Sequence, residues 1–212
     1  MNISYNVPFY SNTPDATHCF QAAVKSVLKY FMPDKDFSWE ELEKITAKGK
    51  DLWTWQMAGL LWLKKNGFDV KYIETFDYDR FINEGGDYLT DQYGEEVGKK
   101  MIKYSNIPAE QKIAKEFIAK APPEKRPADF DDVIAYLKDG YLLILNVNSR
   151  SLNSRPGYAG HFVVVTGLED GKLVFHDPGP PAHESRKMSF DDFTKAWAFP
   201  TENEKNLIAI KT

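Results

Sequence analysis

Two stretches in the last third of the chain, residues 141–147 and 161–168, are rich in β-branched residues and almost entirely apolar. A strand with one face in water alternates apolar and polar residues, whereas a continuous apolar run indicates a strand buried on both faces. Asp170-Gly171 follows the second stretch and leads into another β-rich segment at 173–177, which is typical of an antiparallel hairpin. A final strand is expected at 206–210.

Most helical patterns come before these strands. From Cys19 to Phe31, apolar residues recur at spacings of three and four, and Pro33 ends the pattern. Ser38 followed by Glu41 predicts a capping box at the start of a second helix. Helices first and antiparallel strands last predict an α+β fold. The other expected elements are a third helix capped by Thr54 and ending at 66–67, a strand at 68–73, a helix at 129–138, and a helix from Ser189 through Ala196.

Residues from about 77 to 125 differ from the rest of the chain. They are highly charged and helical in pattern, with Gly85-Gly86 inside and Pro122-Pro123 at the end. Two or three helices are expected, the last running from Pro108 in its first turn to Lys120. We expect residues 1–212 to form a single domain in which 77–125 is a helical insertion. A surface subdomain, a lid over a cleft and a partner surface are all compatible with this composition.

The composition excludes several classes of protein. The chain has 212 residues, a net charge of −4 and one cysteine. This charge offers no basic field for nucleic acid or anionic lipid, and the apolar runs are too short to span a bilayer. A lone cysteine and the lack of a visible signal peptide favour a cytoplasmic protein. No cofactor or metal is expected, because neither a phosphate-binding loop nor tight metal-ligand spacing occurs. The oligomeric state is not indicated.

Cys19 is expected in the first turn of its helix, where unpaired backbone N–H groups and the helix dipole favour a thiolate. A thiolate nucleophile needs an imidazole as acid and base, and a third group that orients the ring. His161 begins a buried strand and Asp177 ends the next strand of the same hairpin, so the hairpin brings them within cross-strand reach. The alternatives are a small core cysteine and an ion pair without a catalytic role.

Several blocks of the sequence together resemble one family. The blocks are Val7-Pro8-Phe9-Tyr10-Ser11, Cys19 opening a helix with Ala22, Ala23 and Val24, then Gly160-His161-Phe162-Val163-Val164-Val165-Thr166-Gly167, and His176-Asp177-Pro178. Over about residues 5–31 and 140–180 the chain resembles the papain-like cysteine peptidases that process bacteriocin precursors after a double glycine. The resemblance implies a papain-like fold, with N-terminal helices packed on a C-terminal antiparallel sheet. It also implies Cys19 as nucleophile, His161 as general base and Asp177 as the residue that orients the imidazole.

Two positions depart from the family's pattern. Phe20 follows the expected nucleophile, where the family usually has Gly, and the Gln that usually lies shortly before the nucleophile is absent. Asn12 is the nearest equivalent, since it carries the same amide on a shorter stem. We therefore expect Asn12 and the backbone N–H of Cys19 to form the oxyanion hole.

Three functions remain open. The first is a cysteine peptidase or amidohydrolase that acts on a peptide or amide substrate through a thioester acyl-enzyme. The second is an acyltransferase with the same triad, and the third is a peptide-binding module that keeps the fold without the activity. Around the expected site, Tyr158 is predicted to line the substrate groove, and Trp53, Trp55 and Trp62 to lie in the core. Of the remaining histidines, His18 is expected at the surface or in the cleft wall, His176 on the other face of its strand, and His183 at the rim.

Overall fold

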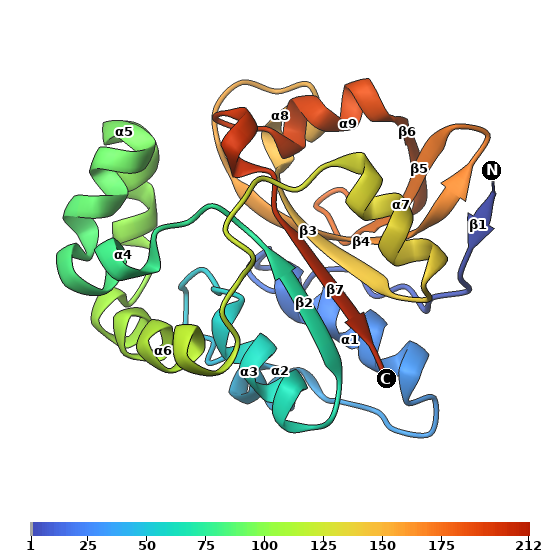
Figure 1. Ribbon diagram of the computed structural model, residues 1–212, viewed down its shortest axis with the longest axis horizontal. Helices are drawn as coiled ribbons and strands as arrows, with labels where there is room; N and C mark the ends of the chain where they lie inside the picture. Colours follow the sequence, from blue (N-terminus) through green and yellow to red (C-terminus); the bar gives the residue numbers. More distant parts are fainter. Residues whose placement is uncertain (1) are drawn as a thin grey trace.

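The computed structural model describes residues 2–212, which form one antiparallel sheet with helices on both faces (Figure 1). Within these residues the strand order is β2-β7-β3-β4-β5-β6, and β1 pairs separately with β4. The strands are β1 (Ile3–Ser4), β2 (Asp69–Ile73), β3 (Leu142–Asn148), β4 (Gly160–Glu169), β5 (Lys172–Asp177), β6 (His183–Ser189) and β7 (Leu207–Lys211). The five predicted strands are confirmed to within a residue or two at their ends. The structure adds β1, which is very short, and β6, which is almost entirely polar.

The central strands are buried on both faces, as the sequence predicts. Successive residues of β3 enter different cores: Leu142 and Ile144 lie in one, whereas Leu143 and Leu145 lie in the other. The first face is covered by α1 (Cys19–Phe31), α2 (Trp39–Ile45) and α3 (Met57–Lys65), and the second by α7 (Phe130–Lys138) and α9 (Phe190–Trp197) (Figure 1). Each strand in this region therefore separates two helical layers.

Side-chain caps set the start of several helices. Ser38 and Glu41 form the predicted capping box of α2. Thr54, predicted to cap the third helix, does not do so, because Gln56 is the N-cap residue of α3. The hydroxyl of Thr54 instead accepts a hydrogen bond of 2.9 Å from the buried amide of Gln21. The predicted start of this helix was therefore too early.

The segment from 77 to 125 contains α4 (Tyr78–Glu84), α5 (Gly86–Lys103) and α6 (Ile107–Lys120), which lie together to one side of β2 (Figure 1). Asp77 caps α4, Asn106 caps α6, and Pro108 lies in the first turn of α6 as predicted. Apolar side chains of these helices join the core on the α1 side of the sheet. None of the described helices is long and apolar enough to cross a membrane. Two short turns, α8 (Ser149–Leu152) and a 3-10 turn at Glu202–Glu204, were not predicted.

The β4–β5 hairpin turns at Asp170-Gly171, where both residues have positive φ values of 50° and 74°. A bulge between Val165 and Gly167 then shifts the register, so that Val164 pairs with His176. Extending this register places Asp177 opposite position 163, two residues along β4 from His161. His161 and Asp177 are therefore diagonal neighbours on one face of the hairpin, which is still within side-chain reach.

Candidate active site

Cys19 is the first residue of α1 and is partly accessible. The first backbone N–H groups of a helix have no intrahelical acceptor, so they favour negative charge at this sulfur. The helix packs against β4, where the rings of Phe20 and Phe162 lie 4.7 Å apart. Phe20 fits after the cysteine because Gly59 leaves room for it: a Cβ atom at Gly59 would lie 2.8 Å from the Phe20 ring.

His161 lies between Cys19 and Asp177. Its Nε2 is 2.8 Å from Oδ1 of Asp177, and its ring lies close enough to Cys19 to lower the pKa of the thiol. Since the carboxylate occupies Nε2, Nδ1 is the nitrogen left for the sulfur. His161 is 5% exposed and Asp177 is 1% exposed, so water competes little for their hydrogen bond. The structure thus brings together the three residues that the sequence predicts as a triad.

Both oxygens of Asp177 are fixed. Oδ1 also accepts a hydrogen bond of 2.9 Å from the backbone N–H of Gly179, and Oδ2 accepts one of 2.9 Å from Arg186 on β6. Arg186 is in turn held by Oδ1 of Asn153 at 3.0 Å and by the carbonyl oxygen of Leu152. The carboxylate therefore cannot rotate away from the imidazole without breaking charge-assisted hydrogen bonds.

The electrostatics of the three groups favour an ion pair. Burial raises the pKa of Cys19, but the hydrogen bond and charge of His161 outweigh burial, so the pKa of the thiol is lowered overall. Burial lowers the pKa of His161, yet its bonds with Asp177 and Cys19 raise it to about 9. Burial also opposes ionisation of Asp177, whose pKa is nevertheless lowered by His161, Gly179 and Arg186. These directions favour a thiolate beside an imidazolium at neutral pH.

Asn12 lies in the loop before Cys19, and its side chain is already engaged. Its Oδ1 accepts hydrogen bonds from the backbone N–H groups of Thr13 at 2.9 Å and His18 at 2.8 Å, and its Nδ2 donates to the carbonyl oxygen of Gly179 at 3.1 Å. These bonds tie the loop before Cys19 to the turn after Asp177. Within residues 2–212 one hydrogen of the Asn12 amide has no recorded acceptor.

The other histidines have structural partners or lie outside the cleft. His18 is buried rather than at the surface, with its Nε2 2.7 Å from the carboxylate of Glu43. His176 donates a hydrogen bond of 2.8 Å from Nε2 to the carbonyl oxygen of Val7. His183 is exposed. No group of ligands in residues 2–212 could hold a metal ion.

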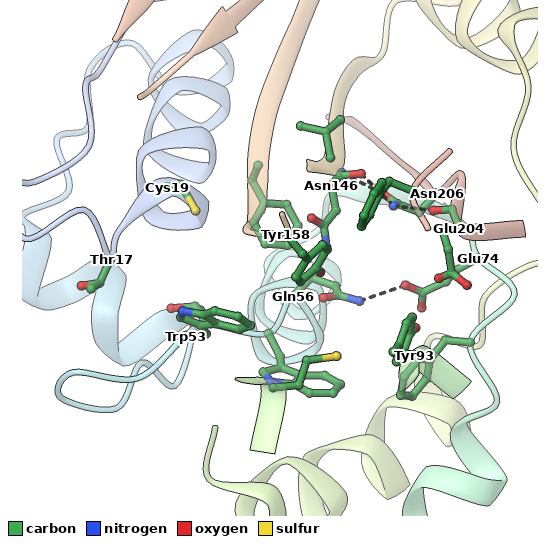
Figure 2. Close-up of a pocket in the computed structure, with 18 of the residues that line it drawn as sticks. Thr17, Cys19, Trp53, Gln56, Glu74, Tyr93, Asn146, Tyr158, Glu204 and Asn206 are labelled. Carbon is green, nitrogen blue, oxygen red and sulfur yellow. Dashed lines mark hydrogen bonds between the residues drawn. The ribbon is translucent and has the colours of Figure 1, made fainter. Parts of the chain in front are cut away.

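Two cavities meet at Cys19. One, the triad cavity, lies over His161 and Asp177, and the other, the aromatic cavity, runs from Cys19 between aromatic side chains (Figure 2). Tyr158, predicted to line the substrate groove, lines the aromatic cavity. Trp53 and Trp55 also line it, from the loop before α3. The predicted core position is confirmed for Trp55, which also packs against the core and stacks on Phe81 at 5.0 Å, and for Trp62, which packs against Phe37, but not for Trp53.

The far end of the aromatic cavity is polar, which the sequence did not predict. Gln56, Glu74 and Glu204 line this end, together with Asn146 and Asn206 (Figure 2). Glu204 lies in a stretch of charged residues that is typical of a solvated surface turn. Only the packing of β7 against β2 and β3 brings that turn over the cavity, so no local pattern could have identified it.

A helix that presents a cysteine at its start, packed on an antiparallel sheet that presents a histidine and an aspartate, defines the papain-like fold. The model of the Peptidase_C39 like family matches residues 4–201, and the chain belongs to this family. Among solved structures, the peptidase domain of Streptococcus ComA, a bi-functional ABC transporter involved in a quorum sensing pathway, is 17% identical with a TM-score of 0.52; the match covers 95% of this chain and 96% of that one. A C39-like peptidase from Bacillus anthracis is 15% identical with a TM-score of 0.48, over 100% of this chain and 98% of that one. No curated protein sequence matches the chain.

Proposed function

We propose that the protein is a cysteine peptidase or amidohydrolase that uses Cys19, His161 and Asp177 as a catalytic triad. The observation that best supports this function is the position of the His161 ring, which pairs with Asp177 at 2.8 Å and lies beside Cys19, whose thiol pKa it lowers. A hairpin-end ion pair without a catalytic role would not need a thiol as the third partner.

In the proposed reaction the Cys19 thiolate attacks the carbonyl carbon of a peptide or amide bond. The imidazolium of His161 then gives its proton to the departing amine, and a thioester acyl-enzyme remains. Water attacks the thioester while His161 takes up its proton, which releases a carboxylic acid and restores the thiolate. Asp177, held by Arg186, keeps the ring oriented and stabilises its charge throughout.

The oxyanion of each tetrahedral intermediate needs hydrogen-bond donors. We propose the backbone N–H of Cys19 as one donor and the remaining amide hydrogen of Asn12 as the other. In support of Asn12, the loop bond to Gly179 uses only one of its two amide hydrogens. Losing one such donor typically lowers kcat by about 10²–10³-fold.

The same acyl-enzyme can be intercepted by an amine, which would make the protein an acyltransferase. The two reactions share every step up to the thioester and differ only in the acceptor. Residues 77–125 are proposed to be an insertion within the single papain-like domain, and their helices contribute side chains to the cavity at Cys19.

The test is the formation of an acyl-enzyme from p-nitrophenyl acetate. We expect a burst of one p-nitrophenolate per chain and an acetyl group located on Cys19 by peptide mass spectrometry. The burst should disappear in Cys19→Ala and slow by at least about 100-fold in His161→Ala, because general acid–base catalysis contributes a factor of that order. Acetylation of added glycinamide in preference to water would identify acyl transfer. Acetylation of Cys19 at the same rate in His161→Ala as in the native chain would contradict the proposal.

A further inference from the structure

The aromatic cavity at Cys19 ends in two carboxyl groups that the proposed chemistry does not use. Glu74 directly follows β2, and Glu204 ends the 3-10 turn before β7. Figure 2 shows the two carboxyl groups side by side at the end of the cavity away from Cys19. Both side chains are partly accessible, and the accessible part faces the cavity. A group bound near Cys19 could therefore reach them through the cavity.

No cation of the described chain compensates these carboxyl groups. The nearby lysines are engaged elsewhere, Lys125 with Asp77 at 3.5 Å and Lys205 with Glu202 at 2.8 Å. Burial raises the pKa of Glu74 to about 7, and the proximity of Glu204 adds to this effect. The pKa of Glu204 is also raised by burial. Two neighbouring acids without a counter-charge are costly to ionise, and a bound cation would remove this cost.

A glutamine amide adds a further acceptor at this end of the cavity. Gln56 lines the cavity and is 8% exposed. Its Nε2 donates to the hydroxyl of Tyr72 at 2.6 Å and lies 3.4 Å from Oε1 of Glu74, which fixes the orientation of the amide. Within residues 2–212 its Oε1 has no hydrogen-bond partner but is not fully buried, so it can accept from a group in the cavity. The carboxylate of Glu74 already accepts from the hydroxyl of Tyr78 at 2.6 Å, so this end of the cavity holds several acceptors with no cation among its described residues.

The path from Cys19 to this end has aromatic walls. Tyr158 stacks on Phe199 with ring centroids 5.8 Å apart, and Trp53 meets the Tyr158 ring at 6.4 Å. The indole N–H of Trp55 donates to Ser105 at 2.9 Å, which fixes that ring on the opposite side. Aromatic faces accommodate both an aliphatic stem and a cation. Acceptors at the end of an aromatic channel match a long side chain with a positive tip.

We propose that this cavity is the substrate subsite for a basic side chain, the ammonium of Lys or the guanidinium of Arg, placed next to the carbonyl group that Cys19 attacks. The inference rests on the proposed function for the position of the scissile bond, but not for the binding of the cation itself. The helical segment supplies Tyr78, Tyr93 and Met101 to the walls, which makes it part of the specificity site.

The first test measures binding without catalysis. Agmatine, which carries a guanidinium and an ammonium at the two ends of a four-carbon chain, is titrated against the tryptophan fluorescence of the full chain, with n-butylurea as the uncharged probe. We expect saturable quenching by agmatine alone, because Trp53 and Trp55 line the cavity, and its loss in Glu74→Gln and in Glu204→Gln. The control Glu116→Gln, an exposed residue paired with Lys120 on α6, should leave the response unchanged. Equal responses to agmatine and n-butylurea, or none to either, would overturn the proposal.

The second test measures specificity at the thiol. Peptidyl acyloxymethyl ketones carrying Lys or norleucine at the first, second or third residue before the reactive group are compared by their rates of Cys19 inactivation. At one of these positions we expect Lys to be preferred by at least about tenfold, as charge pairing in a desolvated site typically gives. Glu74→Gln and Glu204→Gln should abolish the preference while the norleucine probes react as before. A preference that survives both substitutions would exclude the subsite.

The two tests separate this inference from the proposed function. If agmatine binds but Cys19 is unreactive, the catalytic proposal is contradicted and the cation site is supported. If Cys19 reacts in a His161-dependent way but does not distinguish Lys from norleucine, and agmatine does not bind, the catalytic proposal is supported and the cation site is contradicted.

Discussion

At the scale of single residues, the position of Asp177 depends on a side chain that lies outside the triad. Arg186 donates a hydrogen bond to the carboxylate oxygen that His161 leaves free. Its own position is set by Asn153 and by the carbonyl oxygen of Leu152, which belong to the turn after β3. A planar guanidinium can make these contacts together, which an ammonium cannot reproduce. Arg186 is therefore a positioning residue.

Replacing Arg186 should affect the imidazole through Asp177. We expect Arg186→Gln to lower the deacylation rate by about tenfold or more, since misplaced catalytic groups carry costs of this order. The pKa of Asp177 should also rise, so activity should fall at a higher pH on the acid side. Arg186→Lys should restore part of the rate because it keeps the charge. The pH profile of p-nitrophenyl acetate turnover measures both effects, and a variant that lost only thermal stability would show that Arg186 is merely structural.

The sequence predicted Cys19, His161 and Asp177 as candidate catalytic residues but not the residues around them. Cys19 opens a helix, where a thiolate is favoured, and His161 stands at the mouth of an apolar strand, where a packing role is hard to assign. Arg186 could not be found, because β6 is polar along its length and gives no alternation that predicts a strand. The position of Glu204 at the cavity could not be predicted either. A charged turn is normally solvated, and only tertiary packing brings the turn that contains Glu204 over the cavity.

At the scale of secondary-structure elements, β4 carries two features that the sequence pattern did not specify. One is the bulge between Val165 and Gly167, which sets the diagonal relation of His161 and Asp177. The other is the pairing of β1 with the same strand, in which Ile3 lies opposite Leu168 and Ser4 opposite Gly167. A Cβ atom at Gly167 would lie 2.1 Å from the carbonyl oxygen of Ile3, so only glycine fits beneath β1.

Gly167→Ala should therefore displace β1. We expect the free energy of unfolding to fall by about 1–3 kcal/mol, the usual cost of inserting an atom into a packed site. Urea denaturation measures this loss. In a chain that lacks residues 1–4 the same substitution should be nearly neutral, because its clash partner is gone. An equal loss in both backgrounds would show that the glycine is required for a reason other than the pairing with β1.

At the scale of the whole molecule, the α+β architecture and most element boundaries could be predicted because apolar periodicity and capping residues act locally. Ser38 with Glu41 opens its helix as predicted, and the turn at Asp170-Gly171 closes its hairpin. What local patterns cannot specify is how distant segments dock. The helices at 78–120 join the core beside α1 and extend the cavity away from Cys19, and this arrangement depends on contacts between segments far apart in the sequence.

The central claim is that α1, β4 and β5 together hold a thiolate–imidazolium pair. The lowered pKa of Cys19 and the pKa of about 9 for His161 define a pH range in which both groups are charged. Iodoacetamide reacts with the thiolate, and the chain has one cysteine, so the alkylation rate reports on Cys19 alone.

The most direct measurement is therefore the rate of Cys19 alkylation against pH in the native chain and in His161→Ala. For the native chain we predict a plateau that persists well below the ordinary thiol pKa of about 8.5, and a further change only as His161 loses its proton near pH 9. For His161→Ala the plateau should vanish, and the rate should fall about tenfold for each pH unit below the thiol pKa. Identical, ordinary thiol profiles in both chains would contradict the account.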